Sequence, residues 1–305
     1  MSVRSLVEFF KIPESVRIPI LGGWLYKLAT KIDNKQIRKE KIKSYPLNTA
    51  PREEKVIASL TSFPARIEYV HLAIKSLMLQ TYKPDRIILW LAEEQFPEKK
   101  LPKSLIGLCD YGLEIKWIHD LYGHKKYFYP IKEQKPNELI ITFDDDIIYV
   151  PHLIANLIKK HNKFPNALVC ERGQTLNLKK MDENPGRWET ISSIGVNRTT
   201  FSMNPSPGGG CLIPPNAFYK DAINEEKIRK LAYKNDDLWY MFMCAENGTS
   251  MVKAHKYHKS FSLITGSQQE QMATENVGQN RNVIIMEGLK IEYPRAWERI
   301  LTDRK

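Results

Sequence analysis

Short apolar runs and helical patterns alternate regularly between residues 51 and 161, and this alternation constrains the fold more than any other feature of the chain. The apolar runs predict buried strands, and the segments between them have helical spacing of apolar residues. The predicted strands are 56–60, 86–91, 113–118 and 139–143, and the predicted helices are 67–80, 101–109, 125–133 and 152–161. Strands and helices that alternate in this way form βαβ units around a mostly parallel sheet. We therefore expect an α/β, Rossmann-like fold with helices flanking a mostly parallel central sheet.

Polar residues follow the predicted strands, at the points where those strands end. Ligands of parallel sheets bind beyond the carboxyl ends of the strands, so these residues form one candidate group. The group comprises Thr61, Ser62 and Arg66 after the first strand, Glu93 and Glu94 after the second, Asp120 after the third, and Asp144 to Asp146 after the fourth. The chain contains neither G-x-G-x-x-G nor G-x-x-x-x-G-K-[ST]. Both absences argue against a dinucleotide enzyme and against a P-loop enzyme.

Three adjacent aspartates, Asp144 to Asp146, stand directly after the strand 139–143. Their carboxylates repel one another, and placing them at the end of a buried strand destabilises the fold unless a cation neutralises them. Hard divalent cations bind carboxylate oxygens, and Mg²⁺ or Mn²⁺ also bridges substrate phosphates. The alternative interpretation is an exposed acidic turn that caps the next helix. The position after a buried strand favours a metal and diphosphate site.

Three passages, taken in order, resemble the GT-A class of nucleotide-sugar glycosyltransferases. They are residues 57–66 (IASLTSFPAR), 77–87 (LMLQTYKPDRI) and 139–151, which carries the aspartates. Within that class they are most similar to bacterial enzymes of polysaccharide and lipopolysaccharide assembly, over about residues 55 to 265. The resemblance implies a GT-A fold, a nucleotide-diphosphate sugar donor such as a UDP-sugar, and Mn²⁺ or Mg²⁺. It also implies a glycan or a lipid-linked saccharide as acceptor, and no nucleic acid partner.

Carried over by position, the resemblance assigns roles to residues after each strand. Its first loop meets the nucleotide, its diphosphate lies near basic residues, its aspartates face ribose and metal, and a glycine-bearing strand lines the sugar site. The positions that match here are Thr61, Ser62, Arg66, Asp120, Lys125, Lys126, Asp144, Asp145, Gly209 and Gly210. Asp145 is the additional member of the triplet, and its role is left open. The alternatives are a turn with a helix cap for the first loop, solvated lysines, and a flexible glycine turn.

The resemblance also places an acidic pair and a late histidine in the site. Asp236 and Asp237 precede an apolar, aromatic segment, where the family carries the carboxylate that takes the acceptor proton or lies beneath the anomeric carbon. We favour Asp237 as the catalytic residue, with Asp236 next; a helix N-cap is the alternative for this segment. The resemblance implies Asp146 as the direct metal ligand, helped by Asp144. His255 or His258 is implied as a third ligand, and ordinary surface or packing roles are the alternative.

Residues 1–50 form an expected appendage, because Pro13, Pro19, Gly22, Gly23 and Pro46 interrupt any regular pattern there. Residues 51–150 form the expected nucleotide-sugar half. Residues 151–305 form the acceptor half and the C-terminal helices. The formal net charge is +11, and basic residues dominate 31–43. That run is either a solvated segment or, together with the apolar clusters before it, a contact with an anionic membrane.

The four cysteines are scattered without zinc-type spacing, and no secretory leader is evident at the start. We therefore expect free thiols and a cytoplasmic protein, with the inner face of the cell membrane as the site of any peripheral contact.

Two other classes of function remain open at this point. A nucleotidyltransferase or metal phosphohydrolase also uses acidic clusters at strand ends. The first would carry a glycine-rich basic loop after strand one, which 61–66 lacks, and the second would carry its aspartates near the first strand. A non-catalytic scaffold for membranes or polyanions is the third possibility, and the aspartates at 144, 146 and 237 argue against it.

Overall fold

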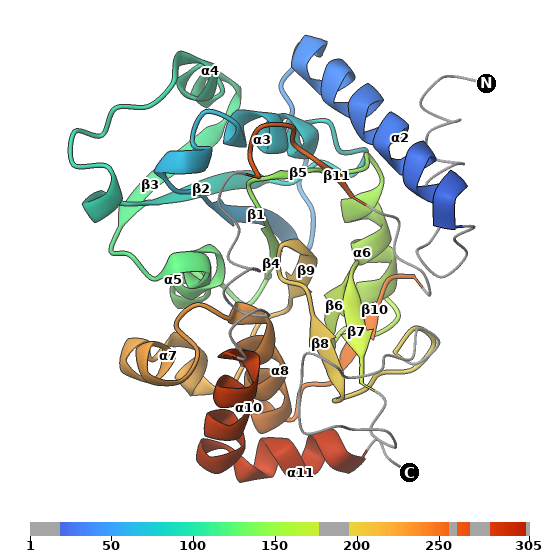
Figure 1. Cartoon of the computed structure of the whole chain (residues 1–305), viewed down its shortest axis with the longest axis vertical. Helices are drawn as coiled ribbons and strands as arrows, with labels where there is room; N and C mark the ends of the chain where they lie inside the picture. The colour runs from blue at the N-terminus through green and yellow to red at the C-terminus, as the bar shows by residue number, and fades with distance from the viewer. Residues whose placement is uncertain (1–18, 177–194, 256–260, 269–280, 303–305) are drawn as a thin grey trace.

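The computed structural model describes residues 19–176, 195–255, 261–268 and 281–302, and a seven-stranded sheet lies at its centre (Figure 1). The order of strands across this sheet is β10-β6-β9-β4-β1-β2-β3. The strands are β1 (Lys55–Thr61), β2 (Arg86–Ala92), β3 (Leu113–Ile118), β4 (Glu138–Phe143), β6 (Leu168–Cys170), β9 (Gly209–Ile213) and β10 (Met251–Lys253). Two small antiparallel sheets pair β5 (Ile147–Ile148) with β11 (Ser262–Leu263) and β7 (Gly173–Thr175) with β8 (Met203–Pro205).

Most of the large sheet is parallel, as expected. β1 pairs in parallel with β2 and β4, β2 with β3, and β6 with β10. Only β9 runs antiparallel to its two neighbours, β4 and β6. The carboxyl ends of the six parallel strands therefore share one edge of the sheet with the amino end of β9. Ligand sites of such sheets lie at this edge.

Two apolar clusters fill the two faces of the sheet, because side chains alternate along each strand. On one face, Leu139 and Ile141 of β4 pack against α3 (Val70–Met78) and α6 (Leu153–His161). On the other face, Ile140 packs with α5 (Lys125–Glu133) and α8 (Asp236–Asn247). α10 (Arg281–Glu292) and α11 (Pro294–Thr302) cover the outer side of α8, and α7 (Glu225–Leu231) lies beside α10.

The four predicted strands and three of the four predicted helices are confirmed, with ends that differ by at most three residues. The helix predicted over 101–109 is wrong in extent: only α4 (Lys103–Ile106) and a 3₁₀ turn (Cys109–Tyr111) form. Gly107 directly follows α4, and Gly112, directly after the 3₁₀ turn, takes a positive φ of 91°. A left-handed residue ends helical structure, and glycine reaches it at little cost. The apolar stretch within 205–215 forms the fully buried strand β9.

A second difference lies in the segment before residue 51. Proline and glycine residues predicted broken structure there, whereas the chain forms a 21-residue helix, α2 (Pro19–Lys39). Pro19 occupies the first position, where its missing N–H costs nothing. Each interior glycine costs about 1 kcal/mol relative to alanine. Contacts to the segment 261–265 offset this cost, since Asn34 Nδ2 donates to the carbonyl of Leu263 at 2.8 Å and Asn34 Oδ1 accepts from the N–H of Thr265 at 2.8 Å.

Within the described segment 261–268, Ser262–Leu263 form the short strand β11, which pairs with the two residues of β5. In the part of the chain that the structure describes, the four cysteines are free, as expected, and no helix is long and apolar enough to cross a bilayer.

Candidate functional site

An acidic site occupies the carboxyl edge of the sheet, where β4 ends. Asp144, Asp145 and Asp146 form the turn between β4 and β5, so the sequence prediction of their place after a buried strand is confirmed. The three side chains differ in exposure: that of Asp144 is 41% exposed and those of Asp145 and Asp146 are 6% and 13% exposed. Adjacent carboxylates in one turn thus differ in their exposure to solvent.

The backbone of Asp144 is fixed by Gly208 and Tyr149. The N–H of Asp144 donates to the carbonyl of Gly208 at 3.2 Å and to the hydroxyl of Tyr149 at 2.7 Å. That hydroxyl lies 2.6 Å from the same Gly208 carbonyl. The approach is so close that a Cβ atom on Gly208 would lie 1.6 Å from Asp144 Oδ2. Residue 208 is therefore glycine because the carboxylate of Asp144 occupies the space of a side chain.

Lys126 links the aspartate turn to the start of α8. Its Nζ lies 2.8 Å from Asp144 Oδ1 and 2.8 Å from Asp236 Oδ2, and only 5% of its side chain is exposed. Burial opposes the charge on this amine, but the two carboxylates outweigh it and hold the pKa of Lys126 well above its usual value. Asp144 and Asp236, which are about 90 positions apart in the sequence, are therefore joined through one buried ammonium.

Asp145 is a buried partner of the first loop. Its carboxylate accepts from Ser62 Oγ at 2.6 Å and from the Arg66 guanidinium at 2.8 Å. Arg66 also lies 2.9 Å from Asp146 Oδ2, and Gln268 Nε2 donates to that oxygen at 3.0 Å. The structure thus gives Asp145 the place that the sequence left open: it holds Ser62 and Arg66 against the aspartate turn.

The remaining predicted donor-site residues lie at the ends of β1 and β3 and at the start of α5. Lys125 is buried and paired with Asp120, and Gln95 Nε2 donates to Asp120 Oδ2 at 3.1 Å. Burial lowers the pKa of Lys125, although Asp120 opposes the change. Thr61 donates through Oγ1 to the carbonyl of Trp90 at 2.7 Å. Nucleotide binding by these residues stays a prediction.

The start of α8 presents the predicted acidic pair in its first turn, directly after the N-cap residue Asn235. The side chain of Asn235 accepts from the N–H of Leu238, so the capping alternative applies to Asn235. Asp236 and Asp237 are mostly but not fully buried, and 17% of the Asp236 side chain is exposed. With the cap supplied by Asn235, both carboxylates are left for the site.

The site carries more negative than positive charge. Among the described residues, Lys126 and Arg66 are the cations that form ion pairs with the aspartate turn and Asp236. Burial and the neighbouring Asp144 raise the pKa of Asp146 to about 6. Burial and the neighbouring Asp236 raise the pKa of Asp237 to about 8. Burial contributes most to both shifts, and the repulsion between neighbouring carboxylates adds to it.

A divalent cation fits this excess of negative charge. No three histidine, cysteine, aspartate or glutamate side chains converge into a complete ligand cage within the described ranges. Mg²⁺, however, is bound by one or two carboxylates together with water and substrate phosphates. Asp144, whose carboxylate is partly open to solvent, and Asp146, whose pKa is raised by burial and by the neighbouring Asp144, would supply those two carboxylates.

Two residues at the end of β6 were missed in the sequence. Glu171 N–H donates to the Gly210 carbonyl at 2.9 Å, and the charge of Arg172 acts on Asp237. The signal that could have found them is the short apolar run 167–170 directly before them. His255 Nε2, at the end of β10, lies 3.7 Å from Glu171 Oε1. Metal binding by His255 stays a prediction, and His258 lies outside the described residues.

Of the predicted glycines, Gly209 and Gly210 lie on β9 and pack against protein. A Cβ atom on Gly209 would lie 3.0 Å from that of Arg172, and one on Gly210 would lie 2.9 Å from Leu153 Cδ2. Gly210 has a φ of 100°, which suits glycine. Protein atoms therefore fill the space beside both glycines. If these residues line the sugar site, as predicted, they do so through their backbone atoms.

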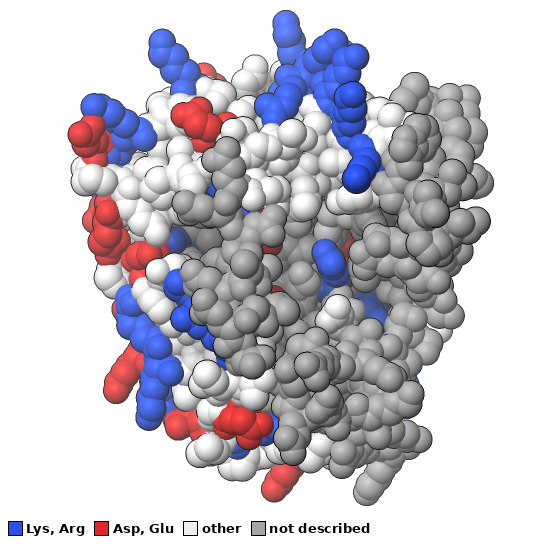
Figure 2. All heavy atoms as spheres, viewed as in Figure 1, with Lys and Arg blue, Asp and Glu red and all other residues white. Residues whose placement is uncertain are grey.

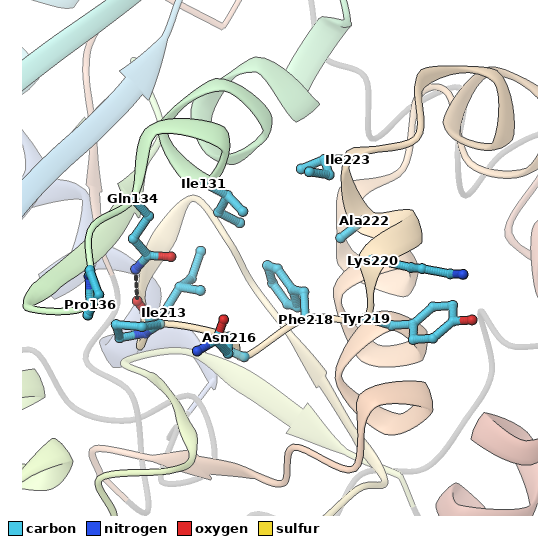
Figure 3. A pocket seen from close by; sticks show the side chains of 12 residues that line it. Ile131, Gln134, Pro136, Ile213, Asn216, Phe218, Tyr219, Lys220, Ala222 and Ile223 are labelled. Carbon is cyan, nitrogen blue, oxygen red and sulfur yellow. Dashed lines mark hydrogen bonds between the residues drawn. The ribbon is translucent and has the colours of Figure 1, made fainter.

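A separate cavity of about 180 Å³ lies at the opposite end of β9 and is shown in Figure 3. Most of its lining is apolar, including Ile131, Ile213 and Phe218. Gln134 Nε2 already donates to the backbone carbonyls of Glu138 and Ile213. None of the carboxylates described above lines this cavity, so it is not the candidate site.

We expect Gly208→Ala to weaken divalent-cation binding by at least about 10-fold, because the added methyl group displaces the Asp144 carboxylate. The side chain of Asp144 can rotate toward solvent, so the free energy of unfolding should fall by only about 1 kcal/mol. Calorimetric titration with Mn²⁺ measures the affinity. Gly288→Ala in α10, where a Cβ atom meets Leu231 Cδ2 at an ordinary 3.5 Å, is the matched control. Unchanged Mn²⁺ affinity in Gly208→Ala contradicts the role of Asp144.

No protein-family model matches the chain, and no curated protein matches it. Among solved structures, similar folds include the mannosyltransferase PcManGT from Pyrobaculum calidifontis in complex with GDP-Man and Mn²⁺. It is 11% identical with a TM-score of 0.41, covering 83% of this chain and 66% of that one. A glucosyl-3-phosphoglycerate synthase from Mycobacterium tuberculosis, in complex with Mn²⁺, UDP and phosphoglyceric acid, is 9% identical with a TM-score of 0.44, covering 80% and 78%.

A 4-diphosphocytidyl-2C-methyl-D-erythritol synthase from Anaerococcus prevotii is also similar, at 13% identity and a TM-score of 0.43, covering 75% of this chain and 96% of that one. The chain therefore spans about two thirds of the mannosyltransferase and nearly all of the 4-diphosphocytidyl-2C-methyl-D-erythritol synthase. At these scores the likenesses carry no argument about the reaction.

Proposed function

We propose that this chain is a glycosyltransferase that moves a sugar from a nucleotide-diphosphate donor to a saccharide acceptor. The observation that carries the proposal is the ion-pair bridge of Lys126, which brings Asp144 and Asp236 to either side of one buried ammonium. A metal-binding pair and a second acidic pair then lie in one site. Transfer from a nucleotide sugar needs both: one to hold the diphosphate and one to act on the acceptor.

The diphosphate end of the site is the aspartate turn. Asp144 and Asp146 would hold Mn²⁺ or Mg²⁺, which stabilises the charge of a departing nucleoside diphosphate when it is bound. Arg66, Lys125 and Lys126 supply further positive charge along this edge. An arginine guanidinium suits phosphate or the edge of a base. A UDP-sugar is the donor that the sequence resemblance favours.

The acceptor end of the site is the first turn of α8. A carboxylate whose pKa is about 8 can take a proton from an acceptor hydroxyl near neutral pH. Asp236 is paired with Lys126 and, despite its burial, has a lowered pKa because of that amine. Asp236 therefore remains ionised and positions the site, while Asp237 is the carboxylate available to act as general base.

We expect Asp146→Ala to lower the release of nucleoside diphosphate from a UDP-sugar by at least about 100-fold, because one of two carboxylate ligands is lost. The thermal shift that Mn²⁺ produces should fall together with turnover. A donor screen by nucleoside-diphosphate release, with and without Mn²⁺, measures the first, and melting curves measure the second. Asp110→Ala, at an exposed position, is the control. Full turnover in Asp146→Ala contradicts the proposed pair of metal-binding carboxylates.

The same assay separates the proposal from a nucleotidyltransferase. That class releases pyrophosphate from a nucleoside triphosphate and a sugar phosphate, whereas a glycosyltransferase releases nucleoside diphosphate from a nucleotide sugar. Pyrophosphate release with no turnover of any nucleotide sugar would replace the proposal with this alternative. Proton NMR of the product's anomeric linkage then shows whether configuration is inverted or retained.

A further inference from the structure

The outer face of α2 carries an aligned stripe of lysines. Lys27, Lys31, Lys35 and Lys39 are spaced four residues apart, so they lie on one face of the helix, and all four are exposed. Figure 2 shows blue side chains gathered over α2, at the top of the molecule, with few red ones beside them. Within the described part of the chain, none of these four lysines forms an ion pair.

The opposite face of α2 is fixed to the protein, which keeps the lysines directed outward. Ala29, Asn34 and Ile37 are buried on that face. Tyr26 Oη donates to the Phe261 carbonyl at 2.9 Å, and Arg38 donates to the Thr265 carbonyl at 2.9 Å. Polar contacts at both ends thus attach α2 to the segment 261–265, and the lysine stripe has a defined orientation.

A cavity of about 270 Å³ lies beside this stripe, between α2 and the residues Leu263 and Thr265. Lys27 and Lys31 line it, as does Thr30, whose Oγ1 is buried and has no hydrogen-bond partner among the described residues. A buried hydroxyl without a partner costs free energy. Two ammonium groups and one available hydroxyl form a suitable surrounding for a phosphate group.

We propose that this face of α2 docks on an anionic bilayer, with a lipid phosphate entering the cavity beside Thr30. Each lysine near an anionic membrane surface contributes about fivefold to binding. Four aligned lysines without acidic partners among the described residues therefore favour this occupant over plain solvation. The exposed Leu28 adds an apolar contact on the same helix.

The docking face is connected to the candidate site. Segment 261–265 pairs with β5 directly after the aspartates, and the N–H of Ile264 donates to the Asp146 carbonyl at 2.8 Å. A protein held to the membrane by α2 carries its aspartate turn close to that surface. Resting on the proposed function, this placement indicates a lipid-linked saccharide as the acceptor class.

The test compares vesicle binding of the full chain with that of a variant carrying Lys27→Gln, Lys31→Gln, Lys35→Gln and Lys39→Gln. Sedimentation with phosphatidylcholine vesicles that contain about a quarter phosphatidylglycerol should show wild-type binding, which phosphatidylcholine alone does not support. The variant should bind at least about 100-fold more weakly, and salt of about 0.5 M should release the wild type. A control with Lys103, Lys159, Lys163 and Lys230 changed to Gln has the same net charge and should bind as wild type.

Equal binding to neutral and anionic vesicles, or an equal loss in the control, overturns the proposal. Capture by an oligonucleotide without vesicle binding overturns it as well, in favour of a polynucleotide partner. Nucleoside-diphosphate release is measured in parallel without vesicles and should be the same in the variant and the wild type. Vesicle binding without any donor turnover would support the docking face and contradict the proposed function.

Discussion

Replacing Lys126 by methionine should destabilise the protein by about 3–5 kcal/mol, since two carboxylates lose the buried ammonium that neutralises them. For a chain of this size the melting temperature should fall by about 10 °C. Lys116→Met is the matched control, because Lys116 pairs with Glu133 near the surface and such pairs contribute about 1 kcal/mol or less. Melting curves of both variants measure the difference.

The same variant distinguishes a structural ion pair from part of a cation site. Without Lys126, Asp144 has more uncompensated charge, so Mn²⁺ should raise the melting temperature of Lys126→Met by more than it raises that of the wild type. Adding Asp144→Asn should recover part of the lost stability and remove the extra Mn²⁺ effect, as interacting residues in a double-mutant cycle do. Equal melting temperatures for Lys126→Met and Lys116→Met are incompatible with this role of Lys126.

The sheet and the place of the aspartate turn were predictable because they depend on local patterns. A buried parallel strand is a continuous apolar run, and β1, β2 and β4 each have one, whereas the half-buried β3 alternates apolar and charged residues. The aspartates come directly after such a run, so their position at the edge of the sheet follows from the chain itself. The start of α8 was predictable for a similar reason, since polar residues precede its apolar, aromatic segment.

The connections within the site were not predictable, because they depend on side chains brought together over long separations. No local pattern shows that Lys126 reaches both Asp144 and Asp236, or that Gln268 reaches Asp146. The three aspartates also look alike in sequence. Only the turn between β4 and β5 directs Asp145 toward Ser62 and Asp144 toward Lys126 and solvent.

α2 shows how tertiary contacts override local preference. Gly22 and Gly23 disfavour a helix by propensity alone. In proteins, however, most helical stability comes from packing one face of the helix on the rest of the fold. Asn34 and Ile37 provide that packing against segment 261–265 and α3, and no pattern near residue 20 indicates partners more than 200 positions away.

Asp237→Asn should make the protein more stable at alkaline pH while it abolishes most activity. The carboxyl of Asp237 has a pKa of about 8 in the folded chain against an ordinary value of 3.8. A raised pKa means that its contribution to stability is complete below about pH 4 and is lost as the pH rises through about 8. Asparagine is neutral throughout, so the variant should melt higher than wild type at about pH 8.5 and nearly level with it at about pH 4. Asp110→Asn, at an exposed position, reports the generic effect of the substitution.

Activity should change in the opposite direction. A general base contributes about 100- to 10,000-fold, so kcat should fall by that factor in Asp237→Asn, while KM for the donor changes little. In the wild type, kcat/KM should rise with pH up to about 8, as the free enzyme's base ionises. Full kcat in the variant with the same gain in stability would leave Asp237 as a strained carboxylate without a catalytic role. Loss of kcat together with that gain identifies Asp237 as a carboxyl group that lowers stability when it ionises but that the reaction requires.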